Sequence, residues 1–239
     1  MKKILFILLL IPRIAFGAVA YDTSGSGAEG ASVSTLSYSH TVTGSNTLIN
    51  CSVSYRPGGG NPTVSAMTYN SVPLALVAVQ NTDPTFAVME MWSLSGAATG
   101  AHTAQVDFTG TVDGAAFDCT SFTGAGSLGT ATTTNDPITG LNCTVPTDGL
   151  CYDVGFDNLG NSGCAARTPG GSAVKRFDIC NDQGVSASVE HFSSTISASA
   201  TMNWDQDSGA FQGQIAVPIN PAAPTPPASV ARRKAMILQ

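Results

Sequence analysis

Polar and apolar residues alternate along Leu48–Arg56 more regularly than in any other stretch of the chain. The apolar positions are Ile49, Cys51, Val53 and Tyr55, and the polar positions between them are Asn50, Ser52, Ser54 and Arg56. A period of two residues is typical of a β-strand, because successive side chains point to opposite faces of a sheet. The pattern predicts a strand with one buried face and one face in water.

Similar short runs of apolar, β-branched and aromatic residues recur along the chain, separated by turn-forming residues. They cover residues 18–23, 34–42, 64–69, 73–79, 86–94, 101–108, 115–122, 150–156, 175–180, 185–192, 200–204 and 211–219. Both faces of 86–94 are apolar, which predicts a central strand, and Asn70-Ser71 predicts a hairpin turn. No stretch keeps a helical period over more than about ten residues. The sequence predicts an all-β, antiparallel β-sandwich of about thirteen strands in a single domain, residues 18–220.

The amino-acid composition supports an all-β fold and restricts the kinds of partner that the protein can bind. Only 11% of the 239 residues are charged, 43% are hydrophobic, and Thr, Ser, Gly and Asn occupy most polar positions, which suits strands joined by turns. All 16 acidic residues follow residue 17, together with seven of the ten Lys and Arg residues, so this part carries a formal charge of −9. Such an acidic body repels nucleic acids and anionic membranes, which excludes nucleic-acid binding for it.

The first 17 residues have the three parts of a signal peptide. Lys2 and Lys3 precede an apolar run at 4–11, and Ala15-Phe-Gly17 places small residues at a cleavage site. Ala18-Val19-Ala20 offers an alternative cleavage site, but we expect cleavage after Gly17, which keeps residues 18–21 for a first strand and makes Ala18 the first residue of the mature chain. The apolar run is far shorter than the about 20 residues of a transmembrane helix, so no transmembrane segment is expected in the mature chain.

A Pro- and Ala-rich segment follows residue 220 and ends in basic and then apolar residues. Proline lacks the backbone N–H that a strand needs, so residues 221–239 are expected to form a flexible tail outside the sandwich. The alternative is a docking tail, in which Arg232, Arg233 and Lys234 engage an acidic partner or another copy of this acidic chain.

The six cysteines indicate disulfides, because an exported chain enters an oxidising compartment. Cys51 and Cys119 belong to the apolar faces of their strands, so we expect them to bridge the sandwich; separate buried thiols are the alternative. The second expected pair flanks the turn sequence Pro146-Thr-Asp-Gly149. The three expected pairs are Cys51–Cys119, Cys143–Cys151 and Cys164–Cys180. No Cys-x-x-Cys is present and the three histidines are scattered, so no zinc site is expected.

Several segments, in their order along the chain, resemble a known architecture. They are Ser-His-Thr-Val at 39–42, Ser-Asn-Thr-Leu-Ile at 45–49, Val-Ser-Ala-Met-Thr-Tyr-Asn-Ser-Val-Pro-Leu at 64–74, Met-Glu-Met-Trp-Ser-Leu at 89–94, and the Pro-rich tail. In this order the chain resembles the jelly-roll-like β-sandwich domains of exported bacterial surface proteins and phage structural proteins. The resemblance covers most of residues 18–220 and implies surface display and non-catalytic work, without assigning functional residues. Three disulfides depart from that family's pattern and favour an extracellular location.

Motifs for catalysis are scarce. The chain has no Gly-x-Ser-x-Gly, and no histidine stands in the sequence context of a catalytic triad. A glycosidase needs two carboxylates about 5 to 9.5 Å apart. Glu90 in the central strand is the best acid candidate, but the sequence identifies no partner for it, so an outward or rim charge is expected. The sequence therefore predicts a protein that is not an enzyme.

Groups suited to binding gather at residues 203–209, Asn-Trp-Asp-Gln-Asp-Ser-Gly. A tryptophan next to acidic and amide side chains can stack on a sugar ring and bond its hydroxyls. The candidate ligand-binding residues are Trp204, Asp205, Gln206 and Asp207, with Tyr55 and Tyr69 in reserve. The alternative is that the tryptophan closes the end of the core.

Two further patterns are incomplete. Asp205, Asp207 and Gly209 match part of a calcium loop, but the downstream glutamate is absent, so calcium is the single possible cofactor. Asn142-Cys-Thr144 matches the N-glycosylation sequon, a short match that is common by chance, in a chain whose leader is of bacterial type.

These observations predict a secreted or surface-displayed, non-enzymatic module that recognises a glycan or a cell surface. The alternative is a structural subunit of a virion or an extracellular assembly, such as a fibre, decoration or filament protein, in which the tail docks to a neighbouring copy. A secreted glycoside hydrolase is the third possibility. The expected partners are a glycan or a protein on a surface.

Overall fold

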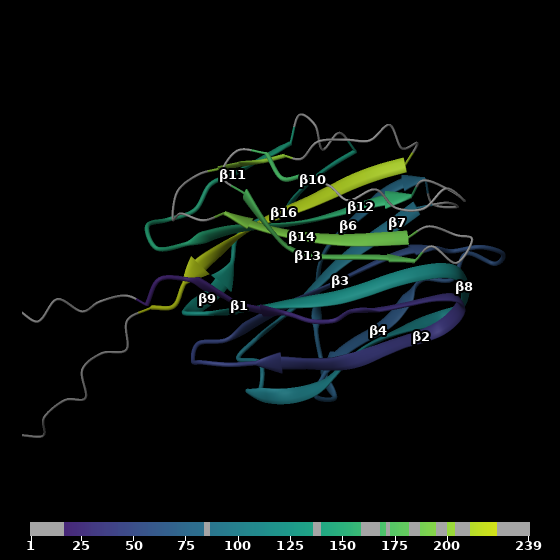
Figure 1. Ribbon diagram of the computed structural model, residues 1–239, viewed down its shortest axis with the longest axis horizontal. Coiled ribbons are helices and arrows are strands. Elements are labelled where there is room, and N and C mark those ends of the chain that lie inside the picture. Colours follow the sequence, from purple (N-terminus) through teal and green to yellow (C-terminus); the bar gives the residue numbers. More distant parts are fainter. Residues whose placement is uncertain are drawn as a thin grey trace, which may run out of the picture.

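The computed structural model describes residues 17–83, 87–135, 140–158, 168–170, 173–181, 187–194, 200–203 and 211–223; for sixteen of the strand residues, Cys180 among them, it describes only the backbone. The predicted signal peptide, apart from Gly17, and nearly all of the predicted tail lie outside these ranges. The described residues form sixteen strands and no helix, and their strand pairings are antiparallel (Figure 1). The predicted all-β class is confirmed, with more strands than the expected thirteen.

Eight strands form the first sheet, in the hydrogen-bonded order β5-β4-β8-β3-β7-β6, with β1 and β2 also paired to β8. They are β1 (Ala20–Ser24), β2 (Ala28–Val42), β3 (Leu48–Arg56), β4 (Val64–Tyr69), β5 (Val72–Pro73), β6 (Ala75–Asp83), β7 (Ala87–Ser95) and β8 (Gly100–Thr123). The two strands predicted at 101–108 and 115–122 are one strand of 24 residues, because the Gly/Thr segment between them continues the strand. The predicted central strand is confirmed as β7, between β3 and β6.

The hairpin predicted around Asn70-Ser71 is present but shorter than expected. Asn70 and Ser71 have φ of 51° and 62°, as the tight turn between β4 and β5 requires. The strand predicted at 73–79 is divided, because β5 stays with β4 whereas β6 leaves to pair with β7.

Six strands form the second sheet, in the order β10-β16-β12-β14-β13, with β9 also paired to β16. They are β9 (Ala125–Leu128), β10 (Thr132–Thr134), β12 (Leu150–Asn158), β13 (Ala173–Asn181), β14 (Ala187–Ser194) and β16 (Phe211–Pro221). A separate two-stranded ladder joins β11 (Leu141–Cys143) to β15 (Ala200–Met202).

The first sheet folds back on itself, and the second sheet packs against it. Tyr38 of β2 meets Phe117 across the fold with ring centroids 5.6 Å apart, and Tyr55 of β3 meets Phe108 at 5.2 Å. One hydrophobic core fills this fold, and another lies between the first and second sheets. In Figure 1, β2 and β4 lie at the bottom, β3 and β8 in the middle, and β12 and β14 at the top.

Because β3 lies in the middle layer, both of its faces are buried. Ile49, Cys51, Val53 and Tyr55 enter the first core as predicted. The polar face predicted to lie in water is wrong: Asn50 and Ser52 are 0% exposed. The second sheet covers them, and the hydroxyl of Tyr152 on β12 reaches Ser52 and Thr120. Strict alternation gave the correct strand but not the correct environment for its polar side.

Two of the three predicted disulfides are present among the described residues. Cys51 and Cys119 are direct cross-strand neighbours on β3 and β8, with Cα atoms 3.9 Å apart, so this bridge joins two strands of one sheet and not the two sheets as expected. The second bridge, Cys143–Cys151, joins β11 to β12 with Cα atoms 5.9 Å apart. The predicted Cys164–Cys180 pair lies outside the described side chains. The two bridges indicate an oxidising environment.

Candidate functional site

Glu90 is held by two aromatic donors on the face of the first sheet that lines the first core. The Tyr55 hydroxyl donates to Glu90 Oε1 over 3.0 Å, and Trp92 Nε1–H donates to Oε2 over 2.9 Å. Strand pairing brings these groups together, because Glu90 lies opposite Val53, two residues before Tyr55, and Trp92 follows Glu90 on the same face of β7. The sequence predicts an outward or rim charge; Glu90 is only 7% exposed, so it does not point outward, and it lies at the wall of a pocket at the margin of the first core.

A pocket of about 340 Å³ opens beside this carboxyl group. Strands β3, β6 and β7 and the loop after β3 line it with Tyr55, Pro57, Asn61, Pro62, Thr63, Val79, Asn81, Val88 and Glu90. Asn61 and Asn81 are exposed and carry amide groups that both donate and accept hydrogen bonds. Glu90 is the single charged residue among the described residues that line the pocket.

The environment of Glu90 favours its neutral form relative to water. Burial raises the pKa of the Glu90 carboxyl, and the hydrogen bonds from Tyr55 and Trp92 oppose this shift. Burial and the nearby Glu90 charge also raise the pKa of the Tyr55 hydroxyl, which therefore remains a donor. A carboxylate has about four acceptor positions, and the Val64 backbone N–H is a third donor to Glu90 beside Tyr55 and Trp92, so about one position is left for a hydrogen bond from the pocket.

Of the six binding residues predicted from the sequence, one lines the Glu90 pocket, one is buried in the core, and four lie outside the described residues. Tyr55 lines the pocket, although it is only 3% exposed and its ring packs on Phe108. Tyr69 is fully buried, and its hydroxyl donates to backbone carbonyls such as that of Gly100, so it offers no ring face for stacking on a ligand. The group Trp204, Asp205, Gln206 and Asp207, with its possible calcium site, lies outside the described residues.

Sequence reasoning missed Trp92, Asn61 and Asn81. For Trp92 a signal was present, because residues two apart in a strand share a face and Trp92 follows Glu90 at that spacing. For the two asparagines there was none, since Asn61 lies in a loop and Asn81 on β6, and only the folded sheet brings them to the same pocket.

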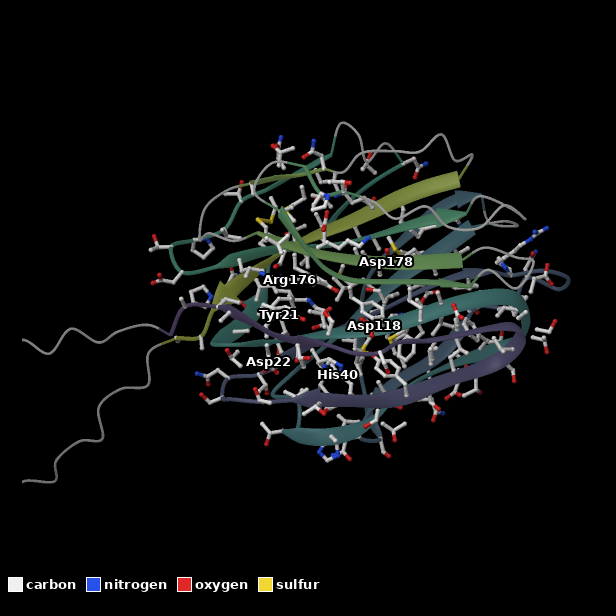
Figure 2. All side chains as sticks on the ribbon, viewed as in Figure 1. Tyr21, Asp22, His40, Asp118, Arg176 and Asp178 are labelled. Atoms are coloured by element: carbon white, nitrogen blue, oxygen red, sulfur yellow. A yellow bond between two sulfur atoms is a disulfide. The ribbon has the colours of Figure 1, made fainter. Side chains whose placement is uncertain are left out.

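Tyr38 and Asp118 form a second polar group in the interior, and its hydrogen bonds join β2 to β8. The Tyr38 hydroxyl donates to Asp118 Oδ1 over 2.7 Å and accepts the backbone N–H of Cys119 over 2.6 Å. Figure 2 places Asp118 and His40 in the middle of the molecule. Burial raises the pKa of the Asp118 carboxyl to about 7, against the effect of its hydrogen bonds, and lowers the pKa of His40 to about 4.

A third polar pair lies on the other face of the second sheet. Gln214 Nε2 donates to Asp153 Oδ2 and, over 2.7 Å, to the Met202 carbonyl of β15. Burial raises the pKa of the Asp153 carboxyl to about 7. Asp153 Oδ1 and Gln214 Oε1 have no hydrogen-bond partner among the described residues. A protonated Asp153 satisfies this geometry better than an ionised one, because its O–H can donate.

Arg176 connects the two sheets at one side of the molecule. Its guanidinium carbon lies 4.4 Å from the ring centroid of Tyr21 on β1, and its Nε donates to Ser193 Oγ on β14 over 2.7 Å (Figure 2). This basic residue therefore serves packing between the sheets.

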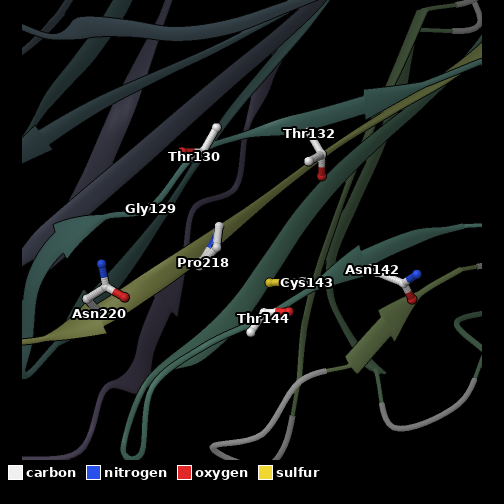
Figure 3. Close-up of a pocket in the computed structure, with 8 residues that line it drawn as sticks. All are labelled: Gly129, Thr130, Thr132, Asn142, Cys143, Thr144, Pro218 and Asn220. Carbon is white, nitrogen blue, oxygen red and sulfur yellow. The ribbon is translucent and has the colours of Figure 1, made fainter.

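A shallow pocket of about 340 Å³ surrounds the Asn142-Cys143-Thr144 sequon (Figure 3). Gly129, Thr130, Thr132, Asn142, Cys143, Thr144, Pro218 and Asn220 line it. The exposed Asn142 accepts a hydrogen bond from Thr201 Oγ1 over 2.9 Å. The pocket has hydroxyl and amide groups but no buried charged group, so it offers less chemistry than the Glu90 pocket.

Within the described ranges, no group of three or more His, Cys, Asp or Glu residues is placed to hold a metal ion, and no helix is long and apolar enough to cross a membrane. Comparison with family models, curated proteins and solved structures finds no match for this chain.

Proposed function

We propose that this protein is a non-enzymatic, exported binding module that recognises a glycan at the Glu90 pocket. The observation that carries the proposal is the buried carboxyl group of Glu90, oriented by Tyr55 and Trp92, at the wall of a pocket that also holds two exposed amides. Sugar-binding sites combine such fixed polar groups with apolar surfaces for the C–H faces of the ring.

The division of roles within the pocket follows from the chemistry of its walls. Glu90 accepts hydrogen bonds from ligand hydroxyls, and Asn61 and Asn81 donate and accept at the exposed side. Pro57, Pro62 and Val79 provide apolar contacts. A neutral or basic saccharide fits this arrangement better than an acidic one, because the pocket wall carries a carboxyl group on an acidic body.

A single acidic group favours binding over hydrolysis. Both stereochemical routes of glycoside hydrolysis require a pair of carboxyl groups about 5 to 9.5 Å apart. No acidic residue other than Glu90 is among the described residues that line the pocket. Glycoside hydrolysis is therefore the weaker hypothesis for this pocket.

Two disulfides and the signal-peptide pattern at residues 1–17 support secretion or display on an extracellular surface. A structural subunit of a virion or extracellular assembly is the alternative function. The observation in its favour is the exposure of three apolar side chains, Val72, Leu76 and Val79, which are suited to contact with another protein.

Glycan-array screening followed by calorimetry tests the proposal. We expect neutral oligosaccharides such as cellotetraose, maltotetraose or chitotetraose to include ligands, and we expect Glu90→Ala and Asn81→Ala to weaken their binding about tenfold or more. The control Asn220→Ala alters the shallow pocket around the sequon and should bind as the wild type does. Absence of binding across the array, or equal binding by Glu90→Ala, would refute the proposed site.

A further inference from the structure

The contacts that the structure describes for the Glu90 carboxyl group are all with hydrogen-bond donors. Tyr55 donates to Oε1 over 3.0 Å, Trp92 donates to Oε2 over 2.9 Å, and the backbone N–H of Val64 is a third donor. Three donors suit an ionised carboxylate, which accepts hydrogen bonds at about four positions and donates none. The hydrogen-bonding pattern is therefore arranged for a negative charge.

No positive side chain compensates this charge within the described part of the pocket. The described lining residues include no lysine, arginine or histidine. Arg56 follows Tyr55 in β3, but alternation places it on the opposite face, where its Nε lies 3.6 Å from Asp113 Oδ2. Burial therefore raises the pKa of Glu90 in spite of its three donors. A buried carboxylate without a counter-charge is costly, and a positively charged ligand would remove that cost.

The polar groups at the pocket match the donors of an ammonium group, which has three N–H donors and no acceptor. The pocket offers about one free acceptor position on Glu90 and the side-chain carbonyl oxygens of Asn61 and Asn81, which are exposed at its open side. Asn81 lies two residues after the partner of Glu90 in β6, so both side chains point to the same face of the sheet. A ligand amine can therefore meet a charged and a neutral acceptor together.

We propose that the Glu90 pocket prefers saccharides with a free, protonated amino group, such as glucosamine units, over neutral saccharides of the same linkage. The inference rests on the proposed glycan site and narrows its ligand class. Glu90 forms a charge-assisted hydrogen bond with the ammonium group, which is stronger than a hydrogen bond with a sugar hydroxyl. The formal charge of −9 on the chain after residue 17 also attracts a cationic ligand.

The walls of the pocket favour an amine on a sugar ring over an inorganic cation. Calcium, for example, binds about six to eight oxygen ligands, whereas Glu90 is the single carboxyl group among the described lining residues. Pro57, Pro62 and Val79 provide apolar surface, which suits the C–H groups of the ring that carries the amine.

Two tetrasaccharides that differ in one group per ring test the preference. The β-1,4-linked glucosamine tetramer carries an ammonium group where cellotetraose carries a hydroxyl group. Calorimetry at about pH 6 should give a dissociation constant about tenfold or more lower for the glucosamine tetramer. The ratio of the two dissociation constants should fall as pH rises through the pKa of the sugar amine, because the neutral amine no longer pairs with the carboxylate.

Glu90→Gln should reduce this ratio to about twofold or less, since it removes the charge and keeps the size of the side chain. Glu29→Gln on β2 is the matched control, because it removes one negative charge at an exposed position outside the pocket; it should keep the ratio of the wild type. Urea unfolding checks that Glu90→Gln is folded. If it is not, Asn81→Lys decides the matter, because it adds a positive charge at the exposed side of the pocket and should also reduce the ratio.

Equal dissociation constants for the two tetramers in the wild type would overturn the preference and leave the glycan site in place. An unchanged ratio in Glu90→Gln would overturn it too, because the overall charge of the chain would then explain the ratio. Tighter binding of acetyl-lysine amide than of the glucosamine tetramer would overturn it in favour of a protein side chain as the ligand. Absence of binding to both tetramers would also overturn it, whereas only absence of binding across the whole glycan array refutes the glycan site as well.

Discussion

The Tyr55 hydroxyl and Glu90 Oε1 lie 3.0 Å apart across the neighbouring strands β3 and β7, at the wall of a pocket that opens to solvent. This contact orients the carboxyl group that the proposed glycan site depends on. It also opposes the effect of burial, because a donor hydrogen-bonded to the carboxyl lowers its pKa.

Tyr55→Phe should therefore raise the pKa of Glu90 further and destabilise the fold by about 1 to 2 kcal/mol. Because the folded-state pKa of Glu90 is already raised, the stability it contributes is lost as pH rises through that pKa. The deficit of the variant should accordingly be larger at pH 8 than at pH 5. Carboxyl-carbon NMR titration and urea unfolding measure the two effects.

Tyr21→Phe is the matched control for that experiment. The Tyr21 hydroxyl donates to Ser24 Oγ over 3.2 Å, a contact between neutral groups. Its loss should leave the titration of Glu90 unchanged. A Glu90 titration curve that is the same in Tyr55→Phe and the wild type would contradict the role given to Tyr55.

The two described disulfides should differ in their effect on stability. Cys51–Cys119 closes a sequence separation of 68 residues and Cys143–Cys151 one of 8. In the chain-entropy model the first contributes about 4 kcal/mol and the second about 2.5 kcal/mol. Urea unfolding of the paired alanine variants should show the larger loss for Cys51/Cys119, and the reverse order would show that chain entropy does not dominate.

Buried titrating groups should make this protein more stable in mild acid than at neutral pH. The pKa values of Asp118 and Asp153 are raised to about 7 in the fold, so the stability they contribute is complete below their unfolded pKa near about 4 and is lost as pH rises toward 7. His40 has the opposite effect on the pH dependence of stability. Its pKa is lowered to about 4, so below about pH 6.5 the unfolded chain binds a proton that the folded chain does not, and stability falls as pH decreases. The two carboxyl groups outweigh the one imidazole.

Asp153→Asn should therefore reduce the loss of stability as pH rises above about 4.5, because it removes one of the buried carboxyl groups with a raised pKa and leaves Asp118 and Glu90 opposed by His40. At pH 8 the variant should be more stable than the wild type by roughly 3 kcal/mol, since an amide can donate to Gln214 Oε1 without carrying a charge. Urea unfolding from pH 5 to 8 measures this. Asp148→Asn, in the turn before β12, is the control, and a wild type whose stability rises from pH 5 to 7 would contradict the prediction.

The sequence predicted the positions of the strands better than it predicted what each face of a strand contacts. Alternation located β3 and the inward position of Cys51, because a pleated strand imposes a period of two on any sheet. It could not reveal that a second sheet covers Ser52, since a small hydroxyl side chain is equally compatible with water and with a buried partner such as Tyr152.

For the candidate site too, the sequence could predict contacts within one strand but not contacts between distant segments. Glu90 and Trp92 share a face of one strand, so their proximity could be predicted from local sequence. The contact between Tyr55 and Glu90 depends on the register between β3 and β7, and the meeting of Asn61 with Asn81 depends on a loop and a distant edge strand. Such contacts depend on how the strands pair, which the local pattern does not encode.

The most direct test of the proposed glycan site is the indole N–H resonance of Trp92. The chain has two tryptophans, so this signal is assigned by one Trp92→Phe variant. In nitrogen–proton correlation spectra recorded during titration with a neutral tetrasaccharide that the array identifies, we predict saturable shifts of the Trp92 indole signal and of the Asn61 and Asn81 side-chain amides. These shifts should be lost in Glu90→Ala and kept in Glu29→Gln. Saturable binding that shifts the signals of other residues, while these three signals stay unchanged, would contradict the assignment of the Glu90 pocket as the glycan site.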